Sequence, residues 1–560
     1  MNLAPHRWGA LCSRTKRETG FERDFMLHMI SVDRVLLLLL CLVTLPAADA
    51  ASPDTPRVKN LILLIGDGMG PQQVGLLTSY AHQAPKSVYG DRPAAIERAM
   101  AEGSLALVRT SPPGVLVTDS AAAATQLATG LAAGAEMVGV DVSGEPAETI
   151  LEKAQQAGKA VGLVTDTRLT HGTPAAFATH RPHRSEENAI ANDLIESDID
   201  VLLGGGLRHW IPQQAAKAGS AAYDEIRHLT GGAYSFSSKR KDNRNLLVEA
   251  RVQGYQLVFN RKQLEQVHTG KVLGLFGSEA MSDALAERAA DKSRSEPSLA
   301  EMTTKALELL AEHRKGFFLM VEAGQIDWAC HNNDTGALLA EMLRMDRTLD
   351  VILRWMEGRD DTVLVITADH ETGGFGFSYS GSHLPTPRRL EGRAFEGRSH
   401  KPDFNFGRPA TLDRLHQQQE SYFTIFRKFD ALEESEQTPA RLMEIVNAAM
   451  PFPITEADAA RILRRGPNRL YVKDHRYLGS PDGPQIDDFS DFYVFGENLR
   501  LNLLARTVAA DQNVVWATGT HTSTPVLAIA VGPDEAQDSI RGMMHSTDLG
   551  KRMQAILLGR

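Results

Sequence analysis

The sequence contains very little cysteine. Its 560 residues include only three, Cys12, Cys41 and Cys330. The first two lie in an N-terminal stretch with the pattern of a removable targeting segment, so the remaining chain keeps one cysteine and cannot form an intrachain disulfide. An exported protein without disulfides has to gain its stability from a large hydrophobic core or from bound metal ions.

An excess of positive charge is also missing. The chain has 60 Lys and Arg residues against 70 Asp and Glu residues, which gives a net charge of −10. This balance argues against a nucleic-acid-binding surface, which needs clustered positive charge. An acidic protein that acts on an anionic substrate needs local positive charge, from arginine or from metal ions. The rest of the composition, 42% hydrophobic and 23% charged, is that of an ordinary globular protein.

No apolar run is long enough to span a membrane. The conspicuous run at 35–45 is short, follows Arg34 and precedes the small residues of Ala48-Asp49-Ala50. That arrangement is typical of a secretory signal peptide, cut near Ala50. We therefore interpret residues 1–50 as a signal peptide with its n-region, and expect a secreted or periplasmic protein without a stable membrane anchor. The alternative is an uncleaved anchor.

Short runs rich in Val, Ile and Leu recur along the rest of the chain, and helical patterns lie between many of them. Strands that alternate with helices predict an α/β fold, with a central, mainly parallel sheet and helices on both faces. The predicted strands are 61–65, 105–108, 160–164, 201–203, 272–276, 317–321, 362–367 and 526–531.

Residues 376–513 interrupt this alternation. The segment is polar and rich in arginine, and it has helix starts of its own at Thr438 and Thr455. We interpret it as a large crown-like or lid-like insertion before the last core strand. Residues 51–375 and 514–560 would then form the main α/β domain.

Carboxylates and imidazoles collect where the predicted strands end. In open α/β sheets, ligands bind beyond the carboxyl ends of the strands, so these side chains should share one rim. They are sufficient for two three-ligand zinc sites with a carboxylate left over, although a solvated rim is the simpler alternative. The residues concerned are Asp67, Glu322, Asp327, His331, Asp369, His370 and His521.

Two of these stretches have simpler interpretations when taken alone. The glycines around Asp67 do not have the G-x-G-x-x-G spacing of a dinucleotide loop, and no P-loop lysine follows. Asp67 is therefore either a solvated residue in a tight turn or a metal ligand. Asp327 and His331 are four residues apart, so on a helix they either bind one ion together or form a surface pair.

Ser120 precedes an alanine-rich segment that should be helical. It is either an ordinary N-cap or a nucleophile at a helix N-terminus, where free N–H groups suit an anion. No histidine adjoins it in a G-x-S-x-G elbow. A nucleophilic Ser120 would need an activator from elsewhere in the chain, and metal coordination is one recognised means.

Six sequence motifs, named at the end of this paragraph, occur in the order found in the alkaline phosphatase family, which the chain therefore resembles. The resemblance covers about 60–375 and 514–560. It implies a secreted bacterial enzyme that hydrolyses phosphate monoesters at alkaline pH through a covalent phosphoserine. The alternatives are a phosphodiesterase of the same superfamily and a metal- or phosphate-binding protein without turnover. The motifs are GDGMG, TDSAAAATQLATG, HGTPAAFATHRPHR, EAGQIDWACH, TADHETGG and TGTHTSTPV.

The resemblance also implies two zinc ions and one magnesium ion per chain. One zinc would activate the serine, and the second would hold the leaving group and then the attacking water. The residues that match the family's ligands are Asp67, Asp369 and His370 for the first zinc, Asp327, His331 and His521 for the second, and Asp67, Thr173 and Glu322 for magnesium.

By the same resemblance, Ser120 is the nucleophile and Arg184 is the arginine that binds phosphate oxygens, with Arg181 as its nearest rival. His171 and Trp328 lie at positions that vary within the family, next to the metal ligands. The resemblance further implies a homodimer. Cys330 adjoins His331 and is expected to be a small buried filler in preference to a ligand.

Cleavage of the signal peptide can be tested directly. Export of the full chain in a bacterial host should give a mature protein that begins at or close to Ala51, because residues 48–50 fit a signal peptidase site. N-terminal sequencing of the exported protein measures this. A product that retains residues 1–50 and stays with the membrane fraction would contradict the prediction.

Overall fold

A computed structural model describes residues 58–232 and 234–559. The predicted signal peptide and its cleavage site lie outside these residues. Within the described ranges, no helix combines the length and apolar character needed to cross a membrane.

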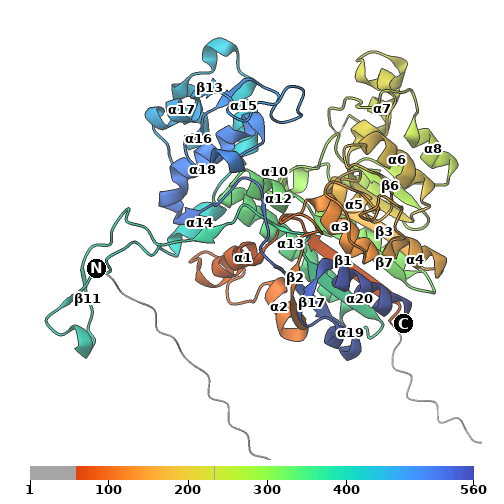
Figure 1. Ribbon diagram of the computed structural model, residues 1–560, viewed down its shortest axis with the longest axis horizontal. Helices are drawn as coiled ribbons and strands as arrows, with labels where there is room; N and C mark the ends of the chain where they lie inside the picture. Colours follow the sequence, from red (N-terminus) through yellow and green to blue (C-terminus); the bar gives the residue numbers. More distant parts are fainter. Residues whose placement is uncertain (1–57, 233, 560) are drawn as a thin grey trace, which may run out of the picture. The chain divides into compact units, whose positions relative to one another are not determined.

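The described residues form a ten-stranded sheet, and all eight predicted strands belong to it (Figure 1). Neighbouring strands are parallel, except that β17 runs antiparallel to both of its neighbours. The α/β prediction with a mainly parallel sheet is therefore confirmed. In spatial order the strands are β18 (Gly542–His545), β2 (Ser104–Arg109), β17 (Val526–Val531), β8 (Thr362–Thr367), β1 (Asn60–Gly66), β7 (Phe317–Ala323), β3 (Ala160–Arg168), β4 (Val201–Gly205), β6 (Val272–Leu275) and β5 (Gln256–Val258).

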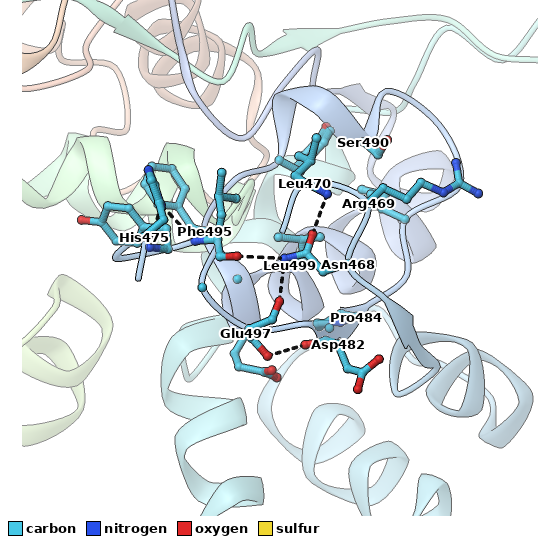
Figure 2. Close-up of a pocket in the computed structure, with 18 of the residues that line it drawn as sticks. Asn468, Arg469, Leu470, His475, Asp482, Pro484, Ser490, Phe495, Glu497 and Leu499 are labelled. Carbon is cyan, nitrogen blue, oxygen red and sulfur yellow. Dashed lines mark hydrogen bonds between the residues drawn. The ribbon is translucent and has the colours of Figure 1, made fainter. Parts of the chain in front are cut away.

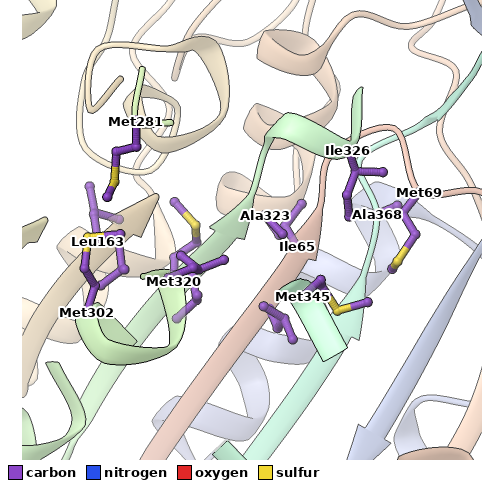
Figure 3. Packing of buried hydrophobic residues seen from close by; sticks show 14 of the residues in the cluster. Ile65, Met69, Leu163, Met281, Met302, Met320, Ala323, Ile326, Met345 and Ala368 are labelled. Atoms are coloured by element: carbon purple, nitrogen blue, oxygen red, sulfur yellow. The ribbon is translucent and has the colours of Figure 1, made fainter. Parts of the chain in front are cut away.

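The central strands are buried along their whole length, as strands covered on both faces must be. Every residue of β1, β7, β3 and β8 is buried. Their near-continuous apolar sequences follow from this, because neither face meets water. Figure 3 shows Met345 and Met302, from two covering helices, packed near Ile65, Leu163 and Met320 of the strands.

Helices cover both faces of the sheet, as predicted. One layer contains α11 and α13, which pack on each other and on β7, together with α1 and α2. The other contains α3, α4 and α20, of which α4 and α20 contact the central strands. The bounds are α1 (Pro71–Gln83), α2 (Ala95–Glu102), α3 (Ser120–Thr129), α4 (Ile150–Gln156), α11 (Leu299–Ala311), α13 (Thr335–Met356) and α20 (Ser546–Leu558).

The direction of β17 determines which residues lie at the carboxyl-terminal edge of the parallel strands. Because β17 is antiparallel, its N-terminal end lies at the edge where β1, β7 and β8 finish. A residue that precedes β17 can therefore join residues that follow the parallel strands. The expectation that β17 is the last core strand was wrong, since the short strand β18 follows it and pairs with β2.

Residues 376–513 contain five α-helices, α14 (Ala410–His416), α15 (Tyr422–Asp430), α16 (Pro439–Ala449), α17 (Glu456–Ile462) and α18 (Leu499–Gln512). The predicted helix starts are confirmed: the side chain of Thr438 caps α16 and that of Thr455 caps α17. A short antiparallel pair, β10 (Gly376–Phe377) with β15 (Val514–Val515), joins the two ends of the segment. Asp334, the N-cap of α13, accepts hydrogen bonds from Gln418 and from the backbone N–H of Tyr422, at 2.8 and 2.7 Å, and so anchors the segment to the core.

Candidate active site

Four of the predicted ligands lie on or just after the central strands. Asp67 follows β1, Glu322 is the penultimate residue of β7, and Asp369 and His370 follow β8. All four are at most 1% exposed. The solvated-turn alternative for Asp67 is thereby excluded, and the solvated-rim alternative fails for these four residues.

A second group comes from a short helix and a distant strand. Helix α12 (Gln325–His331) presents Asp327 and His331 on one face, with Oδ2 and Nε2 3.2 Å apart. His521 lies in β16 (His521–Thr522), which pairs with β9 (Glu371–Thr372). That pairing brings His521 Nε2 to 3.1 Å from His331 Nε2.

Backbone carbonyls fix the orientation of both imidazoles. His331 Nδ1 lies 2.7 Å from the carbonyl oxygen of Gly519, and His521 Nδ1 lies 2.8 Å from that of Thr118. A carbonyl oxygen only accepts, so each Nδ1 carries the hydrogen and each Nε2 turns its lone pair toward the other ring. This is the arrangement by which proteins orient histidines that bind metal ions.

A third cluster surrounds His370. Its Nε2 lies 3.5 Å from Asp67 Oδ1 and 3.3 Å from Asp369 Oδ2. The predicted set was Asp67, Asp369 and His370, and Asp327 also lies in this group, with ligand atoms of Asp67, Asp327 and His370 within 4.8 Å of one another. Backbone N–H groups of Gly68 and His370 donate to Asp369 Oδ1 at 3.2 and 2.9 Å, so that Oδ2 remains for another partner.

The other side of Asp67 meets Glu322 and Thr173. Thr173 Oγ1 donates to Asp67 Oδ2 at 3.3 Å, and Thr167 Oγ1 donates to Glu322 Oε2 at 3.1 Å. His171, expected only beside this site, has a ring nitrogen within 4.8 Å of ligand atoms of Asp67 and Glu322. Trp328, expected nearby, meets the His171 ring edge-on at 6.1 Å between centroids.

Several buried oxygens of these clusters lack a hydrogen bond. Asp67 Oδ1, Asp369 Oδ2 and Glu322 Oε1 have no partner among the described residues. An unpaired buried carboxylate oxygen is costly, and a divalent cation is the partner that satisfies several at once. The residues therefore fit metal ions in both number and type.

Ser120 is the first residue of α3, and the N-cap interpretation of it is wrong. Asp119 is the cap, because its carboxylate accepts from the backbone N–H groups of Ala121 and Ala122 at 2.9 and 3.4 Å. The Ser120 hydroxyl is 1% exposed and lies 3.1 Å from His370 Nε2. It thus stands between the positive end of a helix dipole and the metal-ligand cluster.

Arg184 lies at the same helix end. Its Nη1 donates to Asp119 at 3.3 Å, and its Nη2 donates to His171 Nε2 at 3.0 Å. A Cβ on Gly172 would be 3.1 Å from the Arg184 Cζ, so glycine gives the guanidinium room. The rival, Arg181, forms an ion pair with Asp193 instead.

Burial dominates the electrostatics of the site. It raises the pKa of Asp67 well above its ordinary value, with further contributions from the charges of Asp369 and Asp327. Burial likewise raises the pKa of Asp369, and it raises that of Glu322 to about 7. Burial also lowers the pKa of His521 to about 4. Without cations, the site therefore retains protons on carboxyls and leaves this imidazole neutral.

Three further residues lie next to the ligand clusters. Thr372 Oγ1 donates to Asp327 Oδ1 at 2.6 Å, and its place two residues after His370 could have indicated this. Phe495 packs edge-on against His331, with ring centroids 4.8 Å apart, and nothing in its sequence surroundings indicated that contact. Cys330 is fully buried beside Gln73 and belongs to none of the clusters, as a filler should.

Comparison with known proteins agrees with this geometry. The family model described as alkaline phosphatase matches residues 58–400. Alkaline phosphatase 4 of Bacillus subtilis is 34% identical over 343 residues, which are 60% of this chain and 66% of that protein. The repressible alkaline phosphatase of Saccharomyces cerevisiae is 34% identical over 382 residues, 65% of this chain and 63% of its own. The matched part thus spans slightly less than two thirds of these relatives.

Solved structures extend the similarity to most of the chain. The crystal structure of Thermus thermophilus alkaline phosphatase has a TM-score of 0.69 at 26% identity, and covers 93% of this chain and 96% of its own. A cold-active alkaline phosphatase from Shewanella sp. has a TM-score of 0.64 at 25% identity, and covers 89% and 99%. These matches include the segment 376–513 at least in part.

The raised carboxyl pKa values predict proton release on metal binding. At pH 6 the metal-free site holds protons on groups such as Glu322, with its pKa of about 7, and cation binding must displace them. Loading the site with zinc and magnesium together should therefore release more protons at pH 6 than at pH 8.5, and the affinity for these cations should rise with pH. Calorimetry in buffers of different ionisation enthalpy measures the release.

Glu322→Gln serves as the control, because it removes one titrating carboxyl and keeps the shape of the side chain. It should release about one proton fewer than the parent protein at pH 6. Equal release by the parent protein at both pH values would contradict the prediction.

Proposed function

The chain belongs to the alkaline phosphatase family, and we propose that it hydrolyses phosphate monoesters to an alcohol and inorganic phosphate. One observation carries this proposal: Ser120 Oγ lies 3.1 Å from His370 Nε2, among buried carboxylates that lack hydrogen-bond partners in the described chain. A hydroxyl so placed adjoins both a helix N-terminus and a site suited to cations.

The chemistry follows from these residues. Ser120 Oγ attacks phosphorus, the bond from phosphorus to the alcohol oxygen breaks, and a phosphoserine forms. The leaving alkoxide takes up a proton from water. A water molecule then attacks phosphorus on the side that the alcohol left, the bond from phosphorus to Ser120 Oγ breaks, and the serine oxygen regains a proton as inorganic phosphate leaves. Two inversions give net retention at phosphorus. When bound, zinc supplies Lewis-acid stabilisation of the serine oxygen and of the leaving oxygen. Alkaline pH assists because the attacking water must ionise.

Arg184 supports this role as a phosphate-binding residue. Its two terminal nitrogens point to Asp119 and His171, both at the N-terminal end of α3 or beside it. A guanidinium presents paired N–H groups that fit two phosphate oxygens. Arg184 would bind the two oxygens of the transferred group that face away from Ser120.

We assign two zinc ions and one magnesium ion to the three ligand sets. Asp67, Asp369 and His370 would hold the first zinc, and Asp327, His331 and His521 the second. The third set, Asp67, Thr173 and Glu322, offers only oxygen atoms, which magnesium prefers. His171, whose Nε2 accepts from Arg184, adjoins this set, with a ring nitrogen within 4.8 Å of ligand atoms of Asp67 and Glu322.

Two further proposals rest on the N-terminal sequence pattern and on the family, and not on the geometry. We infer export through the N-terminal segment, for which the N-terminus of the mature protein is the test. We also infer a homodimer, for which the mass in solution at low protein concentration is the test.

Loss of the serine tests the phosphoserine step. Ser120→Ala should lower kcat with p-nitrophenyl phosphate by about a thousandfold or more, because no other group replaces the nucleophile. It should also abolish the phosphoenzyme trapped by acid quenching, while zinc content by mass spectrometry stays unchanged. Ser111→Ala, nine residues earlier in the chain at a partly buried position, is the matched control.

The outcomes separate the proposal from a binding protein without turnover. Unchanged hydrolysis by Ser120→Ala would rule out the serine as nucleophile. Bound zinc without hydrolysis in the parent protein would favour a metal- or phosphate-binding role.

A phosphodiesterase is the closer rival, and Arg184 discriminates. The value of kcat/KM should be at least about a hundredfold higher for p-nitrophenyl phosphate than for bis-p-nitrophenyl phosphate. A monoester has three terminal oxygens, two for the guanidinium fork and one for the cations, whereas a diester has only two. Arg184→Ala should reduce this preference, whereas Arg181→Ala, which only breaks the pair with Asp193, should not. Faster turnover of the diester would overturn the monoesterase proposal.

A further inference from the structure

A cavity of about 510 Å³ lies within residues 467–499, between β13 (Arg465–Pro467), β14 (Asp482–Pro484) and the start of α18 (Figure 2). Its volume is in the range of sites that bind small organic molecules. Three aromatic rings line it, those of Tyr477, Tyr493 and Phe495, together with aliphatic side chains such as Leu470 and Leu478.

The aromatic wall of the cavity reaches the metal-ligand cluster. The Phe495 ring lies edge-on to His331, with centroids 4.8 Å apart. Tyr477 in turn meets Phe495 nearly perpendicularly, at 5.2 Å and 87°. A chain of three rings therefore connects the cavity to a ligand of the second zinc set.

The backbone joins the cavity to the same ligand. The carbonyl oxygen of Phe492 accepts from the Gly519 N–H at 3.2 Å and from Thr518 Oγ1 at 2.9 Å. Gly519 uses its own carbonyl to orient His331. A Cβ on Gly519 would lie 2.9 Å from Tyr493 Cδ1, so the cavity wall packs directly on the loop that orients the ligand.

Several charged side chains of the lining pair with neighbours or point outward, and the remaining charges there are the carboxylates of Asp474 and Asp482. Glu497 forms a two-point ion pair with Arg465, at 2.7 and 2.8 Å. The Arg476 guanidinium lies over the face of the Tyr477 ring, 5.1 Å from the ring centroid. Figure 2 shows the Arg469 guanidinium pointing outward, on the opposite side from His475 and Phe495. Such a lining suits an uncharged group with aromatic surface better than a second anion.

We propose that this cavity receives the alcohol part of the phosphate monoester and favours alcohols that carry a planar aromatic ring. The inference rests on the proposed function, in which the His331 site holds the leaving oxygen. The aromatic rings supply edge and face contacts to a planar group, and each such pair contributes beyond simple burial of area. Tyr477, at the cavity end of the ring chain, is the principal specificity residue.

Phosphonates test the cavity without requiring turnover, because their P–C bond is not hydrolysed. The metal-loaded protein should bind phenylphosphonate at least about fivefold more tightly than methylphosphonate, the factor that about 1 kcal/mol of aromatic contact gives. Tyr477→Ala should remove most of this preference, and Tyr477→Phe, which keeps the ring, should retain it. Titration calorimetry measures both dissociation constants.

Tyr471 provides a matched control. It lies in the same segment with similar exposure, 46% against 43% for Tyr477, but does not line the cavity. Tyr471→Ala should therefore leave the preference for phenylphosphonate unchanged. Equal binding of the two phosphonates by the parent protein, or equal effects of Tyr471→Ala and Tyr477→Ala, would overturn the proposal.

Parallel kinetics separate this inference from the proposed function. Turnover of both phenyl and methyl phosphate, with no phosphonate preference, would remove the cavity proposal and leave the monoesterase intact. A Tyr477-dependent preference for phenylphosphonate, without turnover of any monoester, would keep the aromatic site in the cavity and remove the monoesterase proposal. Adenosine 5′-phosphate, compared with phenyl phosphate in the same variants, distinguishes a nucleoside from a simple aryl group.

Discussion

Buried negative charge at one edge of the sheet is the constraint on which the site depends. Asp67, Glu322 and Asp369 are removed from water, and each has a carboxylate oxygen that lacks a hydrogen-bond partner among the described residues. Such a concentration is tolerable only where positive charge compensates it. The N-terminus of α3 and Arg184 supply part of that charge, and the converging ligand atoms indicate that cations supply the remainder.

The same edge explains how distant parts of the chain cooperate. The parallel strands end at this edge, and the antiparallel strand β17 begins there, so the residues before β17 lie beside those that follow the parallel strands. Residues of the 376–513 segment pack against this edge. Asn502, in α18, donates to the carbonyl oxygen of His331 at 2.8 Å, and Phe495 packs on the His331 ring. The segment is therefore in direct contact with a proposed metal ligand.

Much of this was predictable from sequence, and the failures have physical reasons. The eight buried strands were found because burial on both faces demands continuous apolar runs. Strands β5 and β18 were missed because each is short, lies at an edge and has exposed residues. The residues that converge at this edge could be chosen from sequence because most of them lie at or after the end of a strand and His521 lies just before one. The capping role of Asp119 could not, because Asp119 and Ser120 are adjacent polar residues that are both suited to an N-cap. Phe495 reaches His331 through tertiary folding of a segment without periodic pattern, so no local signal existed.

The pair His331 and His521 has a mechanical consequence as well. The two residues are 190 positions apart, and the whole of 376–513 lies between them. An ion bound to both would act as a reversible crosslink, in a described chain whose one cysteine is free. If it restricted the unfolded chain as a disulfide does, closing a loop of that length would be worth about 5 kcal/mol. With the proposed ion bound, a chain short of cysteine would gain a crosslink made of two imidazoles and a metal ion, which a chelator would remove and added metal would restore.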